Sequence, residues 1–248
     1  MKAMVLAAGL GTRLRPLTDD RPKALVNVGG KTLLEITLLT LRSAGVDEAI
    51  VNVHHFADKI CDYLDENGNF GMRIEISHEE ELLDTGGGLK KAAWFFLEDG
   101  GDEPFLLHNV DVLSTIDLAR MVRQHAEQGA PATLAVQQRE TSRYLLFDEH
   151  AQLCGRRKGR DGQPEMARAA EHAQALAFCG IHVISPRLLR HLDGEMREEG
   201  AFSIIDAYLN LAARGEKIAA FRADEYYWRD LGRVESIAEA ERDLGSGP

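Results

Sequence analysis

Strand-like and helix-like segments alternate through the first half of this sequence, and that alternation restricts the possible folds more than any other feature. Short apolar runs, typical of buried strands, are separated by stretches whose apolar residues recur at three- and four-residue spacing, as in helices. Strands separated by helices form βαβ units, whose strands lie parallel in a sheet covered by helices. The sequence therefore predicts an α/β fold with a Rossmann-like, doubly wound, mainly parallel sheet.

The predicted elements of the first half are strands over residues 4–8, 48–53, 72–77 and 104–110, and helices over residues 32–44, 56–64 and 89–97. The less regular second half predicts a helix over 117–128, strands over 133–138, 144–147 and 176–185, and helices over 186–192, 204–214 and 234–244. The polar, glycine-containing stretch 155–163 predicts a surface turn or hairpin that covers the site.

The stretch 4–25, MVLAAGLGTRLRPLTDDRPKAL, is the candidate ligand loop. It begins as an apolar strand and breaks at Gly9 and Gly11, where glycine lets backbone N–H groups approach a ligand closely. Cations follow, Arg13 and Lys23 among them, in a chain whose formal net charge is −11. Local positive charge against a negative background indicates a site for a small polyanion such as a phosphate chain.

Two familiar phosphate-binding fingerprints do not fit this loop. The Walker A motif requires Gly-Lys-Ser/Thr where this chain has Gly-Thr-Arg. The dinucleotide pattern G-x-G-x-x-G begins at Gly9 but has Leu14 where its third glycine belongs.

A third pattern does fit: LAAGLGTRLRPLT followed by PKAL resembles the signature of the sugar-1-phosphate nucleotidyltransferases, G-x-G-T-R-(L/M) and then P-K. The resemblance implies the nucleotidyltransferase fold with a small β insertion on the sugar side. It implies that Arg13 contacts the β- and γ-phosphates of a nucleotide and that Lys23 contacts the α-phosphate and the incoming sugar phosphate. The nucleotide-binding residues that it implies in the loop are Ala7, Ala8, Gly9, Gly11 and Thr12.

Two aspartates match the family at places expected to hold a metal ion. Asp111 follows the apolar run 104–110 where the family has Asn-Gly-Asp, and Asp230 lies in WRDLG, which resembles W-x-D-x-G. Transfer to a phosphate requires neutralisation of the triphosphate charge, and a hard cation takes oxygen ligands. The resemblance thus implies Mg²⁺, or Mn²⁺ in its place, at these two aspartates. Val110 departs from the family pattern, which usually has glycine there.

The segment 78–88, HEEELLDTGGG, resembles the loop with which family members recognise the nucleotide base. Thr85 and Gly86 match the pattern Leu-Gly-Thr-(Ala/Gly)-Gly, whereas Asp84 replaces a glycine. The TGGG run resembles compact uridylyltransferases acting on N-acetylmuramate 1-phosphate, but the lead-in SHEEE resembles mannose-1-phosphate guanylyltransferases. Glycine next to the ring favours uracil, whereas a carboxylate of the run Glu79 to Glu81 can accept two hydrogen bonds from guanine. Glu79 is the predicted nucleotide-binding residue of this run. Gly180 matches a glycine beneath the sugar.

The expected reaction transfers a nucleotidyl group from a nucleoside triphosphate to a sugar 1-phosphate. The preferred substrates are UTP with N-acetylmuramate 1-phosphate or a related hexose 1-phosphate, in the synthesis of cell-wall or polysaccharide precursors. A mannose- or heptose-1-phosphate guanylyltransferase is the alternative. A catalytically silent, sugar-nucleotide-binding regulatory paralogue is an alternative of another class, but it would lose Arg13, Lys23 or an aspartate, and this chain keeps all four.

Length and composition are consistent with a single nucleotidyltransferase domain over residues 1–248, with a nucleotide-binding half at 1–111 and a sugar-binding half at 112–248. There is no block of Lys and Arg that would indicate a nucleic-acid partner, and no protein partner is implied. No apolar run approaches the roughly 20 residues that span a bilayer, so no membrane association is expected and the predicted location is cytoplasmic.

Overall fold

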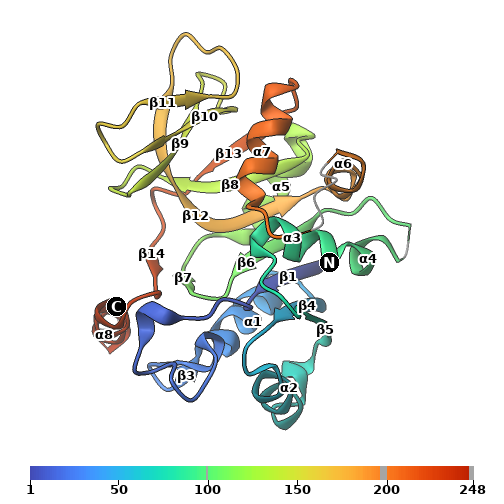
Figure 1. The fold of residues 1–248 in the computed structure, drawn as a ribbon, viewed down its shortest axis with the longest axis vertical. Helices are drawn as coiled ribbons and strands as arrows, with labels where there is room; N and C mark the ends of the chain where they lie inside the picture. Colours follow the sequence, from blue (N-terminus) through green and yellow to red (C-terminus); the bar gives the residue numbers. More distant parts are fainter. Residues whose placement is uncertain (99, 196–199, 246–248) are drawn as a thin grey trace. The chain divides into compact units, whose positions relative to one another are not determined.

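The computed structural model describes residues 1–98, 100–195 and 200–245 (Figure 1). The chain divides into two compact units. Unit 1 comprises residues 1–82, 107–116 and 227–248, and unit 2 comprises residues 83–106 and 117–226. The units interleave along the sequence, so their bounds differ from the predicted halves 1–111 and 112–248, whose nucleotide and sugar roles stay a prediction.

Unit 1 contains the predicted parallel sheet. Strand β1 (Lys2–Leu6) pairs in parallel with β4 (Glu48–Val53), and β4 pairs in parallel with β5 (Arg73–His78). The unit 1 part of β6 (Phe105–Asn109) follows on the other side of β1. The middle residues of β1 are fully buried, as its apolar sequence predicts.

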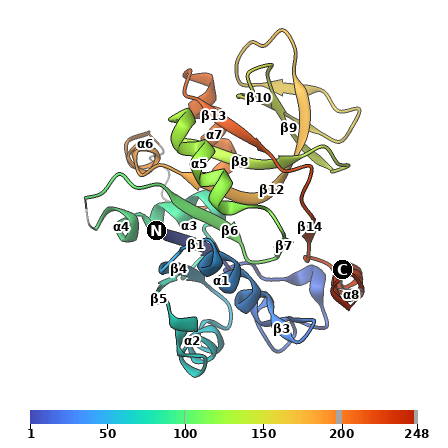
Figure 2. The same ribbon diagram turned by 180° about the vertical axis from the view of Figure 1, so that it is seen from behind.

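Helices α1 (Leu33–Ser43), α2 (Ala57–Glu66) and α8 (Val234–Gly245) belong to unit 1. Helix α1 begins where the hydroxyl of Thr32 accepts a hydrogen bond from the N–H of Glu35 (3.1 Å), and it ends before Gly45, whose φ is +86°. Helix α8 lies beside β14 (Trp228–Asp230) in both views (Figure 1, Figure 2). Its Glu241 accepts a hydrogen bond from the N–H of Gly29 (3.4 Å).

Short elements that the sequence did not predict complete unit 1. They are the antiparallel pair β2 (Asn27–Val28) and β3 (Lys31–Thr32), the antiparallel pair β7 (Val112–Ser114) and β14, and the 3₁₀ helices η1 (Thr12–Leu14), η2 (Lys23–Leu25) and η3 (Gly68–Gly71).

Unit 2 contains a mostly antiparallel sheet, which is the predicted β insertion. Its strands are β8 (Ala132–Gln137), β9 (Arg143–Phe147), β10 (Leu153–Lys158), β11 (Pro164–Met166), β12 (Gln174–Ile184) and β13 (Ile218–Arg222), in the order β11-β10-β9-β12-β8-β13. Only β13 and β8 pair in parallel among these described strands. The predicted surface hairpin is β10–β11, and β13 was not predicted.

The helices of unit 2 are α3 (Asp84–Lys91), α4 (Ala93–Leu97), α5 (Leu118–Gln128), α6 (Arg187–Glu195) and α7 (Ile204–Ala213). The predicted helix 89–97 was wrong at its start, because helix begins at Asp84 and is interrupted at Ala92. Three glycines disfavour a helix by intrinsic propensity, but packing against the segment around Phe202 outweighs that preference.

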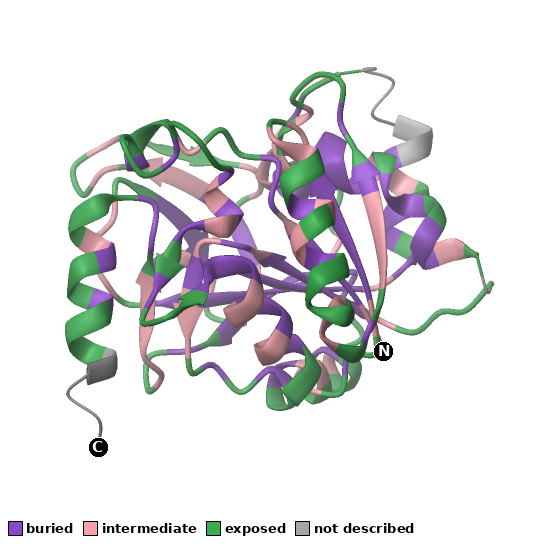
Figure 3. Cartoon of the chain, turned by 90° about the horizontal axis from the view of Figure 1, so that it is seen from below, coloured by how far each residue is buried: buried purple, intermediate pink, exposed green. Residues whose placement is uncertain are grey.

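Buried residues follow the strands, and the outward sides of the helices are exposed (Figure 3). No helix within the described ranges is long and apolar enough to cross a membrane.

His125 on α5 is a buried histidine, 2% exposed. The hydroxyl of Ser185 donates to the carbonyl of Ala130 (3.1 Å), so Nε2 of His125 must donate to Ser185 Oγ (2.9 Å). Nδ1 of the neutral ring can then accept from the hydroxyl of Thr133 (2.9 Å). Burial, followed by repulsion from Arg187, lowers the pKa of His125 to about 4.

We expect the free energy of unfolding to decrease as the pH falls from 6.5 toward 4. The unfolded chain protonates His125 near pH 6.5, whereas the folded chain does so only near pH 4, so acid favours the unfolded state over that window. The loss at the acid end is about 3 kcal/mol for this side chain. Urea unfolding at pH 7 and pH 4.5 measures the change in the free energy of unfolding. His125→Asn should lose this part of the acid dependence, whereas the control His150→Asn, at an exposed histidine, should retain it. Equal acid dependence in wild type and His125→Asn contradicts the prediction.

Candidate functional site

Most of the predicted site residues belong to unit 1, at the carboxyl ends of its parallel strands. The loop at 7–25 follows β1, Glu79 follows β5, and Asp111 follows β6. Ligands of open α/β sheets bind at this edge. Asp230 comes from β14.

The glycine-rich loop has a shape fixed by its own packing. Gly11 has φ +63°, and the hydroxyl of Thr18 donates to its carbonyl (2.9 Å). A Cβ on Gly11 would lie 3.0 Å from side-chain carbons of both Thr18 and Lys23, so space as well as torsion requires glycine here. A Cβ on Gly9 would meet nothing within 4 Å, so that side of Gly9 faces open space. Leu14 anchors the loop in the core and is fully buried.

A buried amide and carboxylate lie against the start of this loop. The side-chain oxygen of Asn52 accepts hydrogen bonds from the N–H groups of Ala7 (2.7 Å) and Ala8 (3.4 Å). Its side-chain nitrogen donates to Oε1 of Glu79 (2.7 Å), which is 1% exposed. Sequence reasoning missed Asn52, because an Asn inside an apolar strand carries no motif of its own.

Lys23 and Asp111 form an ion pair between Nζ and Oδ2. Their side chains are 12% and 16% exposed. Lys23 is therefore a cation of the loop that is enclosed beside the aspartate.

The pairing of β7 with β14 connects the two predicted metal ligands, because Asp111 immediately precedes β7 and Asp230 lies in β14. The β7–β14 pairing sets Val112 opposite Asp230, and the N–H of Leu231 donates to the carbonyl of Asp111 (2.8 Å). Oδ1 of Asp230 accepts from the N–H of Gly232 (2.6 Å). The sequence did not predict this pairing, although it predicted that both aspartates serve one site.

Arg13 reaches the same corner of unit 1. A Cβ on Gly232 would lie 2.6 Å from Oδ1 of Asp230 and 2.8 Å from Nη2 of Arg13, so these two groups flank a single point. Within the residues that the structure describes, no ion pair of Arg13 is found. Its exposed guanidinium has donors available for an anion.

Val110 replaces the glycine of the family pattern without disturbing the sheet. Its side chain is buried, its N–H donates to the carbonyl of Leu6 (3.2 Å), and its carbonyl accepts from the hydroxyl of Thr37 (3.3 Å). The backbone of Val110 is thus held by hydrogen bonds to both Leu6 and Thr37.

The donor set at Asp111 and Asp230 fits a hard divalent cation that also binds a ligand. One oxygen of each carboxylate is engaged, by Lys23 and by the N–H of Gly232. Among the described residues there is no group of three or more His, Cys, Asp or Glu side chains that could hold a metal ion alone. Mg²⁺ commonly takes one or two carboxylates and completes its shell with phosphate oxygens and water.

Thr85 and Gly86 belong to unit 2, where they form hydrogen bonds with the segment 202–204. The hydroxyl of Thr85 accepts from the N–H of Ile204 (3.0 Å), and the N–H of Gly86 donates to the carbonyl of Phe202 (2.9 Å). A Cβ on Gly86 would lie 2.3 Å from the ring of Phe202. The expectation that this glycine leaves space for a base was wrong on that face, because Phe202 fills it.

Gly180 lies within β12 and has φ +73°. The pairing of β12 with β8 shifts in register between Phe178 and His182. A bulge therefore accounts for the glycine, and its contact with a sugar stays a prediction.

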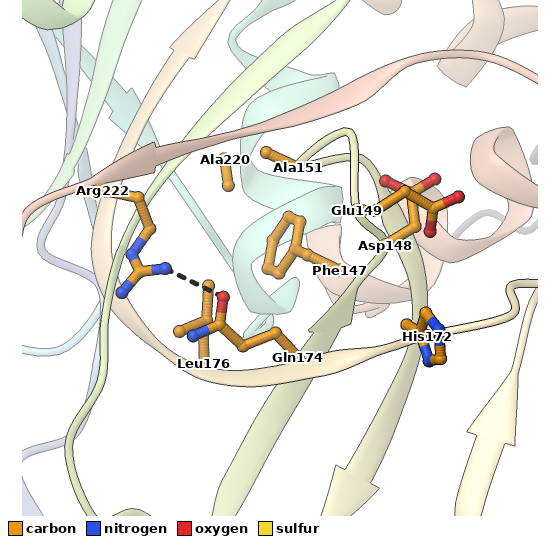
Figure 4. A pocket seen from close by; sticks show the side chains of 9 residues that line it. All are labelled: Phe147, Asp148, Glu149, Ala151, His172, Gln174, Leu176, Ala220 and Arg222. Carbon is orange, nitrogen blue, oxygen red and sulfur yellow. Dashed lines mark hydrogen bonds between the residues drawn. The ribbon is translucent and has the colours of Figure 1, made fainter.

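Unit 2 also contains a cavity of about 280 Å³ between β9, β12 and β13 (Figure 4). Arg222 at its edge donates to Gln174 (2.9 Å) and to Asp224 (2.7 Å), and Asp148 pairs with Arg168. These charged groups are engaged within the protein. None of the sequence-predicted site residues lines the cavity.

The family model described as nucleotidyl transferase matches residues 2–247. The chain is 36% identical over 247 residues to the N-acetylmuramate alpha-1-phosphate uridylyltransferase of Caulobacter vibrioides, covering 98% of this chain and 96% of that protein. It is 38% identical over 239 residues to a mannose-1-phosphate guanyltransferase beta-B of Xenopus laevis, covering 94% of this chain but 61% of that protein.

A solved UDP-glucose pyrophosphorylase complexed with UDP-glucose has the same fold. The TM-score is 0.78 at 18% identity, covering 100% of this chain and 99% of that one.

Proposed function

This chain belongs to the nucleotidyl transferase family, and from that premise we propose that it joins a nucleoside triphosphate to a sugar 1-phosphate, releasing pyrophosphate. The observation that carries the proposal is the gathering of Arg13, Lys23, Asp111 and Asp230 in unit 1 beside the glycine-rich loop. The relatives of this chain in Caulobacter vibrioides and Xenopus laevis are a uridylyltransferase and a guanyltransferase, so the activity is that of a sugar-1-phosphate nucleotidyltransferase.

The proposed reaction is an in-line displacement. A phosphate oxygen of the sugar 1-phosphate attacks the α-phosphorus, and pyrophosphate leaves from the opposite side. The nucleophile is already an anion, so the protein needs to align two mutually repelling groups and screen their charge. We assign the β- and γ-phosphates to the backbone of residues 9–12 and to Arg13. Lys23 has three N–H donors, so it can contact both the α-phosphate and the sugar phosphate while it faces Asp111.

A divalent cation is part of the proposal. Asp111 and Asp230 would hold Mg²⁺, or Mn²⁺ in its place, and the ion would neutralise charge on the phosphate oxygens. The support is that the β7–β14 pairing brings the segments of the two aspartates together and that each carboxylate has one engaged oxygen.

We propose UTP with N-acetylmuramate 1-phosphate or a related hexose 1-phosphate as substrates. The support is the TGGG run and the uridylyltransferase relative, which matches this chain over nearly the whole length of both. Space at Gly86 no longer supports uracil, because Phe202 fills it. The alternative is a mannose- or heptose-1-phosphate guanylyltransferase, which the 38% identity to a guanyltransferase favours. A cytoplasmic location and a role in cell-wall or polysaccharide precursor synthesis stay predictions of the sequence.

One panel of pyrophosphate-release assays tests the reaction and the base together. It crosses UTP, GTP, CTP and dTTP with the 1-phosphates of N-acetylmuramate, glucose and mannose. We expect UTP to give the highest kcat/KM. If kcat/KM with GTP exceeds that with UTP by more than tenfold, the guanylyltransferase assignment replaces the uridylyltransferase one. No turnover with any pair, with nucleotide binding retained, would support the silent regulatory paralogue.

Arg13→Ala is expected to lower turnover by about 10²- to 10³-fold, because it removes a charge contact to the triphosphate. Arg15→Ala, at an exposed arginine of the same loop paired with Asp19, is the matched control and should stay within a few-fold of wild type. Lys23→Ala should lower turnover similarly and also lower the thermal midpoint, because it leaves Asp111 without its enclosed cation. Steady-state kinetics and thermal unfolding measure these effects, and near-normal turnover of Arg13→Ala would sink the phosphate assignment.

Removal of divalent cations is expected to abolish turnover, and excess Mg²⁺ should restore it. Asp111→Asn and Asp230→Asn should each be inactive at saturating Mg²⁺, since an amide is a weaker ligand than a carboxylate. Asp47→Asn, at an exposed aspartate next to β4, should behave as wild type. Undiminished turnover in excess EDTA would rule out the metal site.

A further inference from the structure

We propose that Glu79 is a positioning residue that acts through Asn52 on the start of the nucleotide loop, and that it does not read the nucleotide base. The proposal rests on the proposed function, because it assumes that this loop binds the triphosphate. It replaces the prediction that Glu79 binds the nucleotide, and with it the alternative that its carboxylate contacts guanine.

The orientation of the Asn52 amide follows from its neighbours. Backbone N–H groups can only donate, so the side-chain atom of Asn52 that faces Ala7 (2.7 Å) and Ala8 (3.4 Å) must be its oxygen. The amide nitrogen then faces Glu79, whose Oε1 accepts at 2.7 Å. The carboxylate therefore selects the one amide orientation that can hold the loop.

Glu79 is itself fixed to the end of β4. Its N–H donates to the carbonyl of Val53 (2.8 Å), and its carbonyl lies 2.8 Å from Nδ1 of His54, which must donate to it. Its side chain is 1% exposed, whereas the neighbouring Glu80 and Glu81 are exposed. The carboxylate is thus almost entirely withdrawn from solvent, and the oxygen that is shown to be engaged faces Asn52.

The first residues of the loop bond to the protein, and the later residues are open to a ligand. The N–H of Ala7 is occupied by Asn52 and is not available to a phosphate. The open side of the loop begins at Gly9, where a Cβ would meet nothing. Glu79 and Asn52 thus hold the loop from within the protein and leave its later N–H groups to the ligand, a preorganisation that favours binding of every nucleoside triphosphate equally.

The test compares Glu79→Leu, Glu79→Gln and the exposed control Glu80→Gln. Amide hydrogen exchange at Ala7 and Ala8 is measured without ligand, and kcat and KM are measured with UTP and with GTP. We expect Glu79→Leu to speed exchange at Ala7 and to lower kcat/KM for both nucleotides by the same factor, about tenfold or more, because the Asn52 amide loses a buried acceptor. Glu79→Gln still offers a carbonyl oxygen and should recover most of both effects. Glu80→Gln should match wild type.

An altered UTP-to-GTP ratio in Glu79→Gln would show that Glu79 reads the base and would overturn the proposal. Unchanged exchange at Ala7 in Glu79→Leu would also overturn it. If Glu79→Leu does not fold, Asn52→Ala supplies the second variant, with fast exchange at Ala7 expected and wild-type exchange contradicting the proposal. Absence of turnover in wild type would reject the proposed function alone, since the exchange measurement needs no substrate.

Discussion

The contact between Lys23 and Asp111 is the constraint on which the rest of the site depends. Both side chains are mostly withdrawn from water, and a charge in that position is tolerated only beside its opposite. The lysine follows the glycine-rich loop and the aspartate follows β6, so the pair joins two distant segments of unit 1. Because the Cβ of Lys23 also packs against Gly11, the position of the pair limits the conformation of the loop.

The loop is held on both sides before any ligand arrives. Thr18 and Lys23 enclose Gly11, and Asn52 holds the N–H of Ala7. A loop fixed in this way loses little conformational entropy on binding. Unit 2 uses its glycines differently: Gly86 and its neighbour lie inside a helix, where the absence of side chains lets the chain around Phe202 pack closely.

Features that depend on neighbouring residues in the sequence could be predicted. Strand β4 has the predicted bounds 48–53, because this run contains no glycine or proline that would break a strand. Helix α1 has a capping residue, Thr32, at its start and a glycine, Gly45, just after its end. The loop motif identified Arg13 and Lys23, and two further motif matches identified Asp111 and Asp230. The structure gathers all four residues in unit 1. Long-range features could not be predicted: the β7–β14 pair, the partnership of Asn52 with Glu79, and the helix through Gly86 all depend on residues far away in the sequence.

The pairing of β7 with β14 has a consequence for the order in which the molecule is made. A ribosome that has completed Lys23 and Asp111 must still add more than a hundred residues before it reaches Asp230. At typical synthesis rates of about 5–20 residues per second, that interval is on the order of ten seconds. Throughout it the nascent polypeptide has its glycine-rich loop but lacks the second aspartate. A chain whose translation stops before residue 230 thus has Asp111 but lacks Asp230. The complete pair of carboxylates is present only when synthesis is nearly finished.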